Sequence, residues 1–141
     1  MNPKLQQLLA EHGILPTPQR LAVFGAMAGR RDHPSVDRIY VELRRKLPTL
    51  SKTTVYSTMQ LLAEKHLIGM VHGDREELRF DGSTEFHAHF RCRTCGRLYD
   101  IPLADRHERL FAKLPQGFVS DDEELIYYGT CPDCNNKKKG K

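Results

Sequence analysis

Metal-binding side chains are concentrated in one stretch, Phe86-His-Ala-His-Phe-Arg-Cys-Arg-Thr-Cys-Gly-Arg-Leu-Tyr-Asp100, of a chain of 141 residues. The stretch holds a His-x-His pair, a Cys-x2-Cys pair and a closing carboxylate. A second cysteine pair follows further along the chain, in Cys131-Pro-Asp-Cys134. The cysteines therefore predict one site, and the histidines with Asp100 predict another.

The four cysteines are predicted to form one structural Zn²⁺ site. Each Cys-x2-Cys pair turns two thiolates toward one point, and two pairs complete a tetrahedral sulfur shell with no open position. Disulfides or a thioredoxin-like redox motif are the alternatives. No signal peptide or membrane span is recognisable, so we expect a cytoplasmic protein, where paired cysteines favour metal. A redox motif would need one exposed pair at a helix start. The expected ligands are Cys92, Cys95, Cys131 and Cys134.

A second metal site is predicted around His87 and His89. Alternation along a strand places both imidazoles on one face, and Asp100 lies on the next predicted strand. Asp81, at the hinge just before the stretch, and His33, in the first half, are further candidates. Three imidazoles and two carboxylates suit Fe²⁺ or Mn²⁺, and Zn²⁺ with lower specificity. The remaining histidines are interpreted as structural or surface residues: His12, His66, His72 and His107.

The first half of the chain predicts four short helices. Apolar spacing and capping residues place N-caps at Thr17, Ser35 and Ser51, and a stop for the third helix at Pro48. The fourth helix is expected from Lys52 to about His66. Two strands follow, at 67–72 and 77–80, around a charged hairpin at 73–76. This order is the winged helix-turn-helix pattern.

The fourth predicted helix has an unusual outward face. Val55, Met59 and Leu62 share the inward face, and the opposite face carries hydroxyl, amide and aromatic groups with almost no charge: Thr53, Tyr56, Ser57 and Gln60, with Lys52 at the margin. An ordinary solvent face would carry Glu/Lys pairs. Such groups suit base edges and phosphates in a major groove. The alternative is a small helical domain with a polar surface helix.

The charges divide unevenly between the two halves. Residues 1–80 hold 12 Lys/Arg against 8 Asp/Glu, and residues 81–141 hold 10 against 10. Four of the latter bases lie in the tail Lys137–Lys141, which we interpret as a frayed terminus. The basic first half favours a polyanionic partner.

The predicted fold class is α+β, with a winged-helix DNA-binding domain at 1–80 and a metal-binding dimerisation domain at 81–141. In the second domain we expect strands at 86–91, 97–101 and 117–128 and a helix at 103–114, forming a small α/β unit with a three-stranded antiparallel sheet. Its core is small, so we expect a metal, dimerisation or both to stabilise it.

Taken together, these motifs resemble the ferric uptake regulator family. The resemblance rests on the His-x-His and cysteine stretch, Asp100, Thr17-Pro-Gln-Arg20, His33-Pro34 and Ser51-Lys-Thr-Thr-Val-Tyr56, and runs from about residue 5 to 134. It implies a homodimeric, metal-dependent repressor that binds a double-stranded DNA operator. It also implies regulatory ligands at His33, Asp81, His87, His89 and Asp100, and DNA contacts at Arg20 and Tyr56.

The peroxide-responsive branch of the family is the most similar. Iron-sensing relatives usually carry Glu where this chain has Asp100, and Asp where it has Ala88; zinc-sensing relatives usually place a cysteine near the hinge, and 72–81 has none. The branch implies Fe²⁺-catalysed oxidation of ligand histidines, here His33 and His87.

The predicted function is therefore that of a peroxide-sensing repressor and not of an enzyme. The alternatives are an iron-responsive repressor of metal uptake genes, a small non-haem iron enzyme and a zinc-ribbon nucleic-acid adaptor. The predicted DNA-binding residues are Arg20, Ser51, Lys52, Thr53, Thr54, Tyr56 and Gln60.

Overall fold

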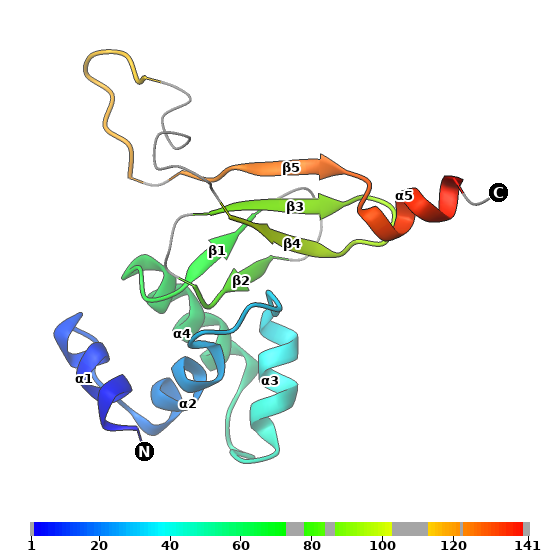
Figure 1. Cartoon of the computed structure of the whole chain (residues 1–141). Helices are drawn as coiled ribbons and strands as arrows, with labels where there is room; N and C mark the ends of the chain where they lie inside the picture. Colours follow the sequence, from blue (N-terminus) through cyan, green and yellow to red (C-terminus); the bar gives the residue numbers. More distant parts are fainter. Residues whose placement is uncertain (1, 73–77, 84–86, 103–112, 122, 140–141) are drawn as a thin grey trace. The chain divides into compact units, whose positions relative to one another are not determined.

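The computed structural model describes residues 2–72, 78–83, 87–102, 113–121 and 123–139. The chain divides into two compact units, Met1–Thr84 and Glu85–Lys141. Within the described ranges, the first unit contains helices α1–α4 and strands β1 and β2, and the second contains strands β3–β5 and helix α5 (Figure 1). The predicted α+β class is confirmed.

The helices of the first unit are α1 (Pro3–Glu11), α2 (Pro18–Met27), α3 (Val36–Arg44) and α4 (Lys52–Glu64). Each begins after a side chain that accepts a hydrogen bond from a backbone N–H of the first turn: Asn2, Thr17, Ser35 and Ser51. The three predicted caps are thus confirmed. Helix α3 ends before the predicted stop at Pro48. No helix in the described ranges combines the length and the apolar character needed to cross a membrane.

The core of the first unit lies between these helices. Val55, Met59 and Leu62 on α4 are completely buried, as the helical spacing predicts. They belong to a cluster with side chains of the other helices and of the small sheet, including Leu9, Leu21, Phe24, Ile39 and Phe80. The outward face of α4 is therefore fixed by the burial of its other side.

Strands β1 (Gly69–Val71) and β2 (Arg79–Asp81) form an antiparallel pair, in which Gly69 lies opposite Asp81. Both strands are shorter than predicted, and the expected hairpin at 73–76 lies outside the described residues. Asp81, predicted to lie at a hinge, is the last residue of β2 and is buried. Its carboxylate is thereby held by a paired strand of the first unit.

The second unit contains a three-stranded sheet with the order β4-β3-β5, built from β3 (Ala88–Cys92), β4 (Leu98–Ile101) and β5 (Ile126–Gly129). Three strands were predicted, but the prediction that all are antiparallel is wrong, because β5 runs parallel to β3. Parallel neighbours need a long connection, and residues 93–125, which include β4, separate β3 from β5 in the sequence. Alternation within a strand does not reveal this direction, since its period is the same either way.

Two other expectations for the second unit need correction. The predicted strand at 117–128 begins only at Ile126, and Val119 is 89% exposed. The Lys tail is not a frayed end throughout, because Lys137 and Lys138 lie in α5 (Pro132–Lys139). Proline at the start and an acid in the first turn favour this helix. Most of the predicted helix at 103–114 lies outside the described residues.

Candidate metal centres and nucleic-acid interface

The four cysteines converge at one end of the second unit's sheet, where their sulfur atoms all lie within 4.8 Å of one another. Cys92 ends β3 and Cys95 lies in the turn that follows, whereas Cys131 precedes α5 and Cys134 lies within it. The parallel pairing of β3 and β5 places Cys92 beside Gly129. Both cysteine pairs consequently reach the same end of the sheet, as a shared site requires.

The spacing of the sulfurs fits tetrahedral zinc. A Zn–S bond of ~2.3 Å requires sulfurs about 3.8 Å apart in a tetrahedral shell. Sγ of Cys95 lies 3.8 Å from Sγ of Cys131. All four cysteines are thiols and not disulfides, and all but Cys95 are buried. The geometry therefore supports a closed sulfur shell over the disulfide alternative.

The local electrostatics favour thiolates. The backbone N–H groups of Cys95 and Cys131 lower the pKa of the Cys92 thiol to about 6, the latter from 3.3 Å. Hydrogen bonding with Cys131, together with burial, raises the pKa of the Cys134 thiol to about 12. Such opposed shifts arise where neighbouring thiols lose protons in succession. A divalent cation bound by the cysteines would favour the deprotonated form of every thiol, because the thiolate is the form that binds metal.

A second donor cluster in the same unit consists of His87, His89 and Asp100. Strand pairing places His89 directly opposite Asp100. Oδ1 of Asp100 lies 3.1 Å from Nε2 of His87 and 3.5 Å from Nε2 of His89. The two imidazole centroids are 4.6 Å apart. Two nitrogen donors and one oxygen donor therefore point to one place. The side chains of His87, His89 and Asp100 are 14%, 10% and 26% exposed.

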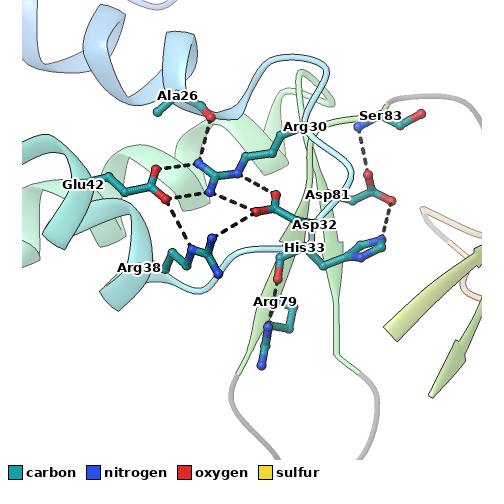
Figure 2. Close-up of polar contacts among 9 residues, drawn as sticks. All are labelled: Ala26, Arg30, Asp32, His33, Arg38, Glu42, Arg79, Asp81 and Ser83. Carbon is teal, nitrogen blue, oxygen red and sulfur yellow. Dashed lines mark hydrogen bonds and ion pairs between the residues drawn. The ribbon is translucent and has the colours of Figure 1, made fainter. Parts of the chain in front are cut away.

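The first unit contributes a separate pair, His33 and Asp81 (Figure 2). Nε2 of His33 lies 3.8 Å from Oδ2 of Asp81, and both side chains are almost fully buried. The other carboxylate oxygen of Asp81 accepts the Ser83 N–H at 2.9 Å. His33 has a left-handed backbone with φ of 51°. Such conformations persist only where surrounding contacts hold them, and they cluster at functional sites.

All of the predicted DNA-contacting side chains except Ser51 line two hollows on the first unit. A groove of about 550 Å³ between α2 and α4 is lined by side chains that include Gln19, Arg20, Thr54 and Gln60. A second hollow of about 420 Å³ is lined by Lys52, Thr53 and Tyr56, among others. The hydroxyl of Tyr56 accepts a hydrogen bond from Nε2 of Gln60 at 2.8 Å. This contact links neighbouring polar groups on the surface of α4.

Ser51 and Lys52, at the start of α4, also have roles within the fold of the first unit. Ser51 caps α4 through its hydrogen bond from the Thr54 N–H, and Lys52 forms an ion pair with Asp37 of α3. Gln19 and Ser57 also line the first groove and were not predicted as contacts. Both could have been found in the sequence, since Gln19 adjoins Arg20 and Ser57 lies on the outward helical face.

The comparisons with known proteins agree with these features. The family model described as "Ferric uptake regulator family" matches residues 11–128. The "Peroxide operon regulator" of Bacillus subtilis (strain 168) is 35% identical over 135 residues, covering 94% of this chain and 92% of the relative.

Among solved structures, PerR from Streptococcus pyogenes, described in terms of peroxide sensing and gene regulation, matches with a TM-score of 0.52 and 27% identity. The match covers 93% of this chain and 90% of PerR. The manganese-containing ferric uptake regulator of Pseudomonas aeruginosa matches with a TM-score of 0.71 and 19% identity. That match covers 90% of this chain and 97% of the other, and it supports the fold.

Proposed function

The chain belongs to the ferric uptake regulator family, and from this premise we propose that it is a peroxide-sensing, metal-dependent transcriptional repressor. The observation that carries the proposal is the presence of two chemically different donor sets. One is made only of sulfur, and the other is made of imidazole and carboxylate. The first suits a permanent structural metal, and the second suits a metal that binds reversibly and can react.

The cysteine set is the structural site. Cys92, Cys95, Cys131 and Cys134 hold Zn²⁺ and join the β3–β4 turn to the start of α5. Support comes from the sulfur spacing and the depressed pKa of Cys92. A four-sulfur shell leaves no position for substrate or water. This zinc therefore stabilises the second unit and takes no part in sensing.

The regulatory site takes His33 and Asp81 from the first unit and His87, His89 and Asp100 from the second. Neither set alone completes the coordination shell of Fe²⁺ or Mn²⁺, which favour imidazole and carboxylate ligands. Only a metal that uses both sets couples the two units. Metal then selects one arrangement of the DNA-binding units in a homodimer. To shift that equilibrium from 1:99 to 99:1, it needs roughly a 10⁴-fold preference for the selected state.

The first unit binds the operator. Side chains on α4 and at the start of α2 contact base edges and phosphates: Arg20, Ser51, Lys52, Thr53, Thr54, Tyr56 and Gln60. Support comes from the two hollows that all of these side chains except Ser51 line. A dimer would place two such helices on the half-sites of a two-fold operator. The repressor acts in the cytoplasm, together with the DNA it regulates.

Peroxide releases the repressor by oxidising its ligands. Bound Fe²⁺ supplies the reductive cleavage of the O–O bond. In the net reaction, one oxygen atom of hydrogen peroxide enters the imidazole ring of His33 or His87, and the other leaves as water. The ring loses two electrons and the peroxide gains them. An oxidised ring is a poorer ligand, so metal and then operator dissociate.

The test uses the zinc-loaded full-length dimer and operator DNA selected from genomic fragments. Binding should require Mn²⁺ or Fe²⁺ and be lost on chelation. His33→Ala should abolish this dependence while zinc content and dimer mass stay unchanged. Peroxide should add one oxygen to His33 or His87 in the Fe²⁺ form and not in the Mn²⁺ form.

Each arm has its own contrary result. Metal-independent operator binding by the wild type, or unchanged metal dependence in His33→Ala, would refute the metal-coupled switch. Unmodified histidines in the peroxide-treated Fe²⁺ form would point instead to an iron-responsive repressor. Oxidation confined to cysteines would indicate a thiol-based sensor.

A further inference from the structure

Four charged side chains form a closed ring beside the loop that carries His33 (Figure 2). Going round the ring, Arg30 pairs with Asp32 at 2.6 Å, Asp32 with Arg38 at 3.7 Å, Arg38 with Glu42 at 3.3 Å, and Glu42 with Arg30 at 2.7 Å. Charges alternate at every step. Asp32 directly precedes His33, and Arg38 and Glu42 lie on α3, so the ring ties this loop to that helix.

Arg30 is the centre of the ring. Its side chain is only 18% exposed. It forms two hydrogen bonds to each carboxylate, to Asp32 at 2.6 and 3.0 Å and to Glu42 at 2.7 Å twice. It also donates to the Ala26 carbonyl at 3.4 Å, in the last turn of α2. The planar guanidinium allows this forked pairing, which a lysine cannot reproduce.

The main chain of Arg30 is bound on its other side to the residue that follows Asp81. The Arg30 carbonyl accepts the Gly82 N–H at 3.1 Å, and the Gly29 N–H donates to the Gly82 carbonyl at 3.3 Å. A Cβ at position 82 would lie 2.5 Å from the Arg30 nitrogen and would overlap the Met27 carbonyl. Only glycine permits this close approach. Arg30 is thus linked to His33 through Asp32 and to Asp81 through Gly82.

His33 depends on such support. It is a buried, non-glycine residue in a left-handed conformation. Its carbonyl accepts from Arg79 at 3.2 Å, and the next carbonyl, that of Pro34, accepts the Phe80 N–H at 3.1 Å. These bonds fix the loop against β2, and the charged ring fixes it against α3. Removing the ring would allow the backbone to relax and His33 to turn away from Asp81.

We propose that Arg30, with its ring partners Asp32, Arg38 and Glu42, is a positioning residue that sets the metal affinity of the His33–Asp81 pair. This proposal rests on the proposed regulatory site, and adds that a residue which touches no metal tunes that site. Groups that orient metal ligands typically change affinity by about 10–100-fold when mutated. Arg30 is expected to act in this range.

The test measures Mn²⁺ binding to the zinc-loaded full-length dimer by the electron paramagnetic resonance of unbound Mn²⁺. Arg30→Gln should raise the Mn²⁺ dissociation constant about tenfold or more. The matched control is Arg31→Gln, which removes the same charge from an exposed neighbour in the same loop. The control should stay within about twofold. Equal effects of both variants would show that general charge, and not positioning, is responsible.

A double-mutant cycle with His33→Ala separates positioning from simple destabilisation. If Arg30 acts through His33, Arg30→Gln should have no further effect in the His33→Ala background. A tenfold loss that persists there would refute the proposal. If His33→Ala itself binds Mn²⁺ normally, the proposed regulatory site fails. If His33→Ala weakens binding and Arg30→Gln does not, only the present proposal fails.

Two milder variants keep the test decisive if Arg30→Gln does not fold. Glu42→Gln preserves shape and removes one ring charge, and Arg30→Lys preserves the charge and removes the fork. Both should weaken Mn²⁺ binding less than Arg30→Gln, and more than Arg31→Gln does. Wild-type affinity in both variants would overturn the proposal.

Discussion

The two units of this protein are stabilised by different means. In the described part of the first unit, fourteen buried apolar side chains from the helices, the connecting segments and β2 form one cluster. In the described part of the second, the buried cluster consists of Cys92, Cys131 and Cys134, with Phe90 and Tyr99 packed against it. The first unit is therefore stabilised by apolar burial, and the second, under the proposed zinc site, is stabilised by its bound metal. One chain would then contain a unit that folds without a ligand and a unit whose stability depends on one.

The largest effect is expected for Cys92→Ser, which removes one of the proposed zinc ligands of the second unit. It should abolish zinc binding and unfold the second unit, since structural Zn²⁺ contributes an apparent ~10–16 kcal/mol in small domains. The first unit should keep its helices. Zinc content and amide NMR spectra measure both results. Thr94→Ala, an exposed change in the same turn, is the control. Retention of dispersed β3–β5 resonances without zinc would contradict the comparison.

The converse change is Leu62→Ala in α4. Leu62 is completely buried in the first unit's core, and truncating such a side chain costs ~2–5 kcal/mol through lost contacts and a cavity. Denaturant unfolding followed by helical circular dichroism should show this loss, while zinc content stays at the wild-type value. Leu61→Ala, at a partly buried neighbour, should cost much less. Zinc loss in Leu62→Ala would mean that the two units do not unfold independently.

The smallest expected effect concerns pH. Hydrogen bonds from Arg30 and then Arg38 lower the pKa of Glu42 from 4.5 to about 2. A carboxyl group whose pKa is lowered by folding stabilises the folded state at pH values above its ordinary pKa. This contribution is lost as the pH falls through the pKa of the folded state. The stability advantage of wild type over Glu42→Gln should therefore shrink between about pH 5 and pH 2. Because Glu42 is 40% exposed, we expect at most about 1 kcal/mol.

Unfolding of the first unit at several pH values, followed by circular dichroism, measures this difference. Glu11→Gln, which removes a carboxylate from the surface of α1 in the same unit, is the control. The difference in unfolding free energy between wild type and Glu42→Gln is the quantity to compare. If it does not change between pH 5 and pH 2, the ring contributes nothing to the acid sensitivity of the first unit.

Features set by neighbouring residues or by ligand chemistry were predictable from the sequence. The caps Thr17, Ser35 and Ser51 each bond to a backbone N–H within three residues, so local pattern is sufficient. The cysteine set was predictable because four thiolates define a zinc shell whatever fold brings them together. The pairing of His89 with Asp100 followed from the short turn between two strands.

Features set by distant segments were not predictable. The direction of β5 was not predictable, because the same alternation of side chains fits a parallel or an antiparallel strand. Asp81 was assigned to a hinge because the second predicted strand ended at Phe80, one residue short of the pairing of Asp81 with Gly69. The ring around Arg30 was missed because Arg30 and Glu42 approach only after α2 and α3 have packed.

The parallel pairing of β3 with β5 also bears on biosynthesis. Residues 1–84 can leave the ribosome and fold first, because they form a compact unit of their own. The first cysteine pair emerges next, but its sheet lacks β5 and its site lacks half of its ligands until residues 126–134 follow. During that interval the nascent chain presents two unprotected thiols. Under the proposed zinc site, metal loading is consequently a late step, and oxidants that act before it would trap an immature chain.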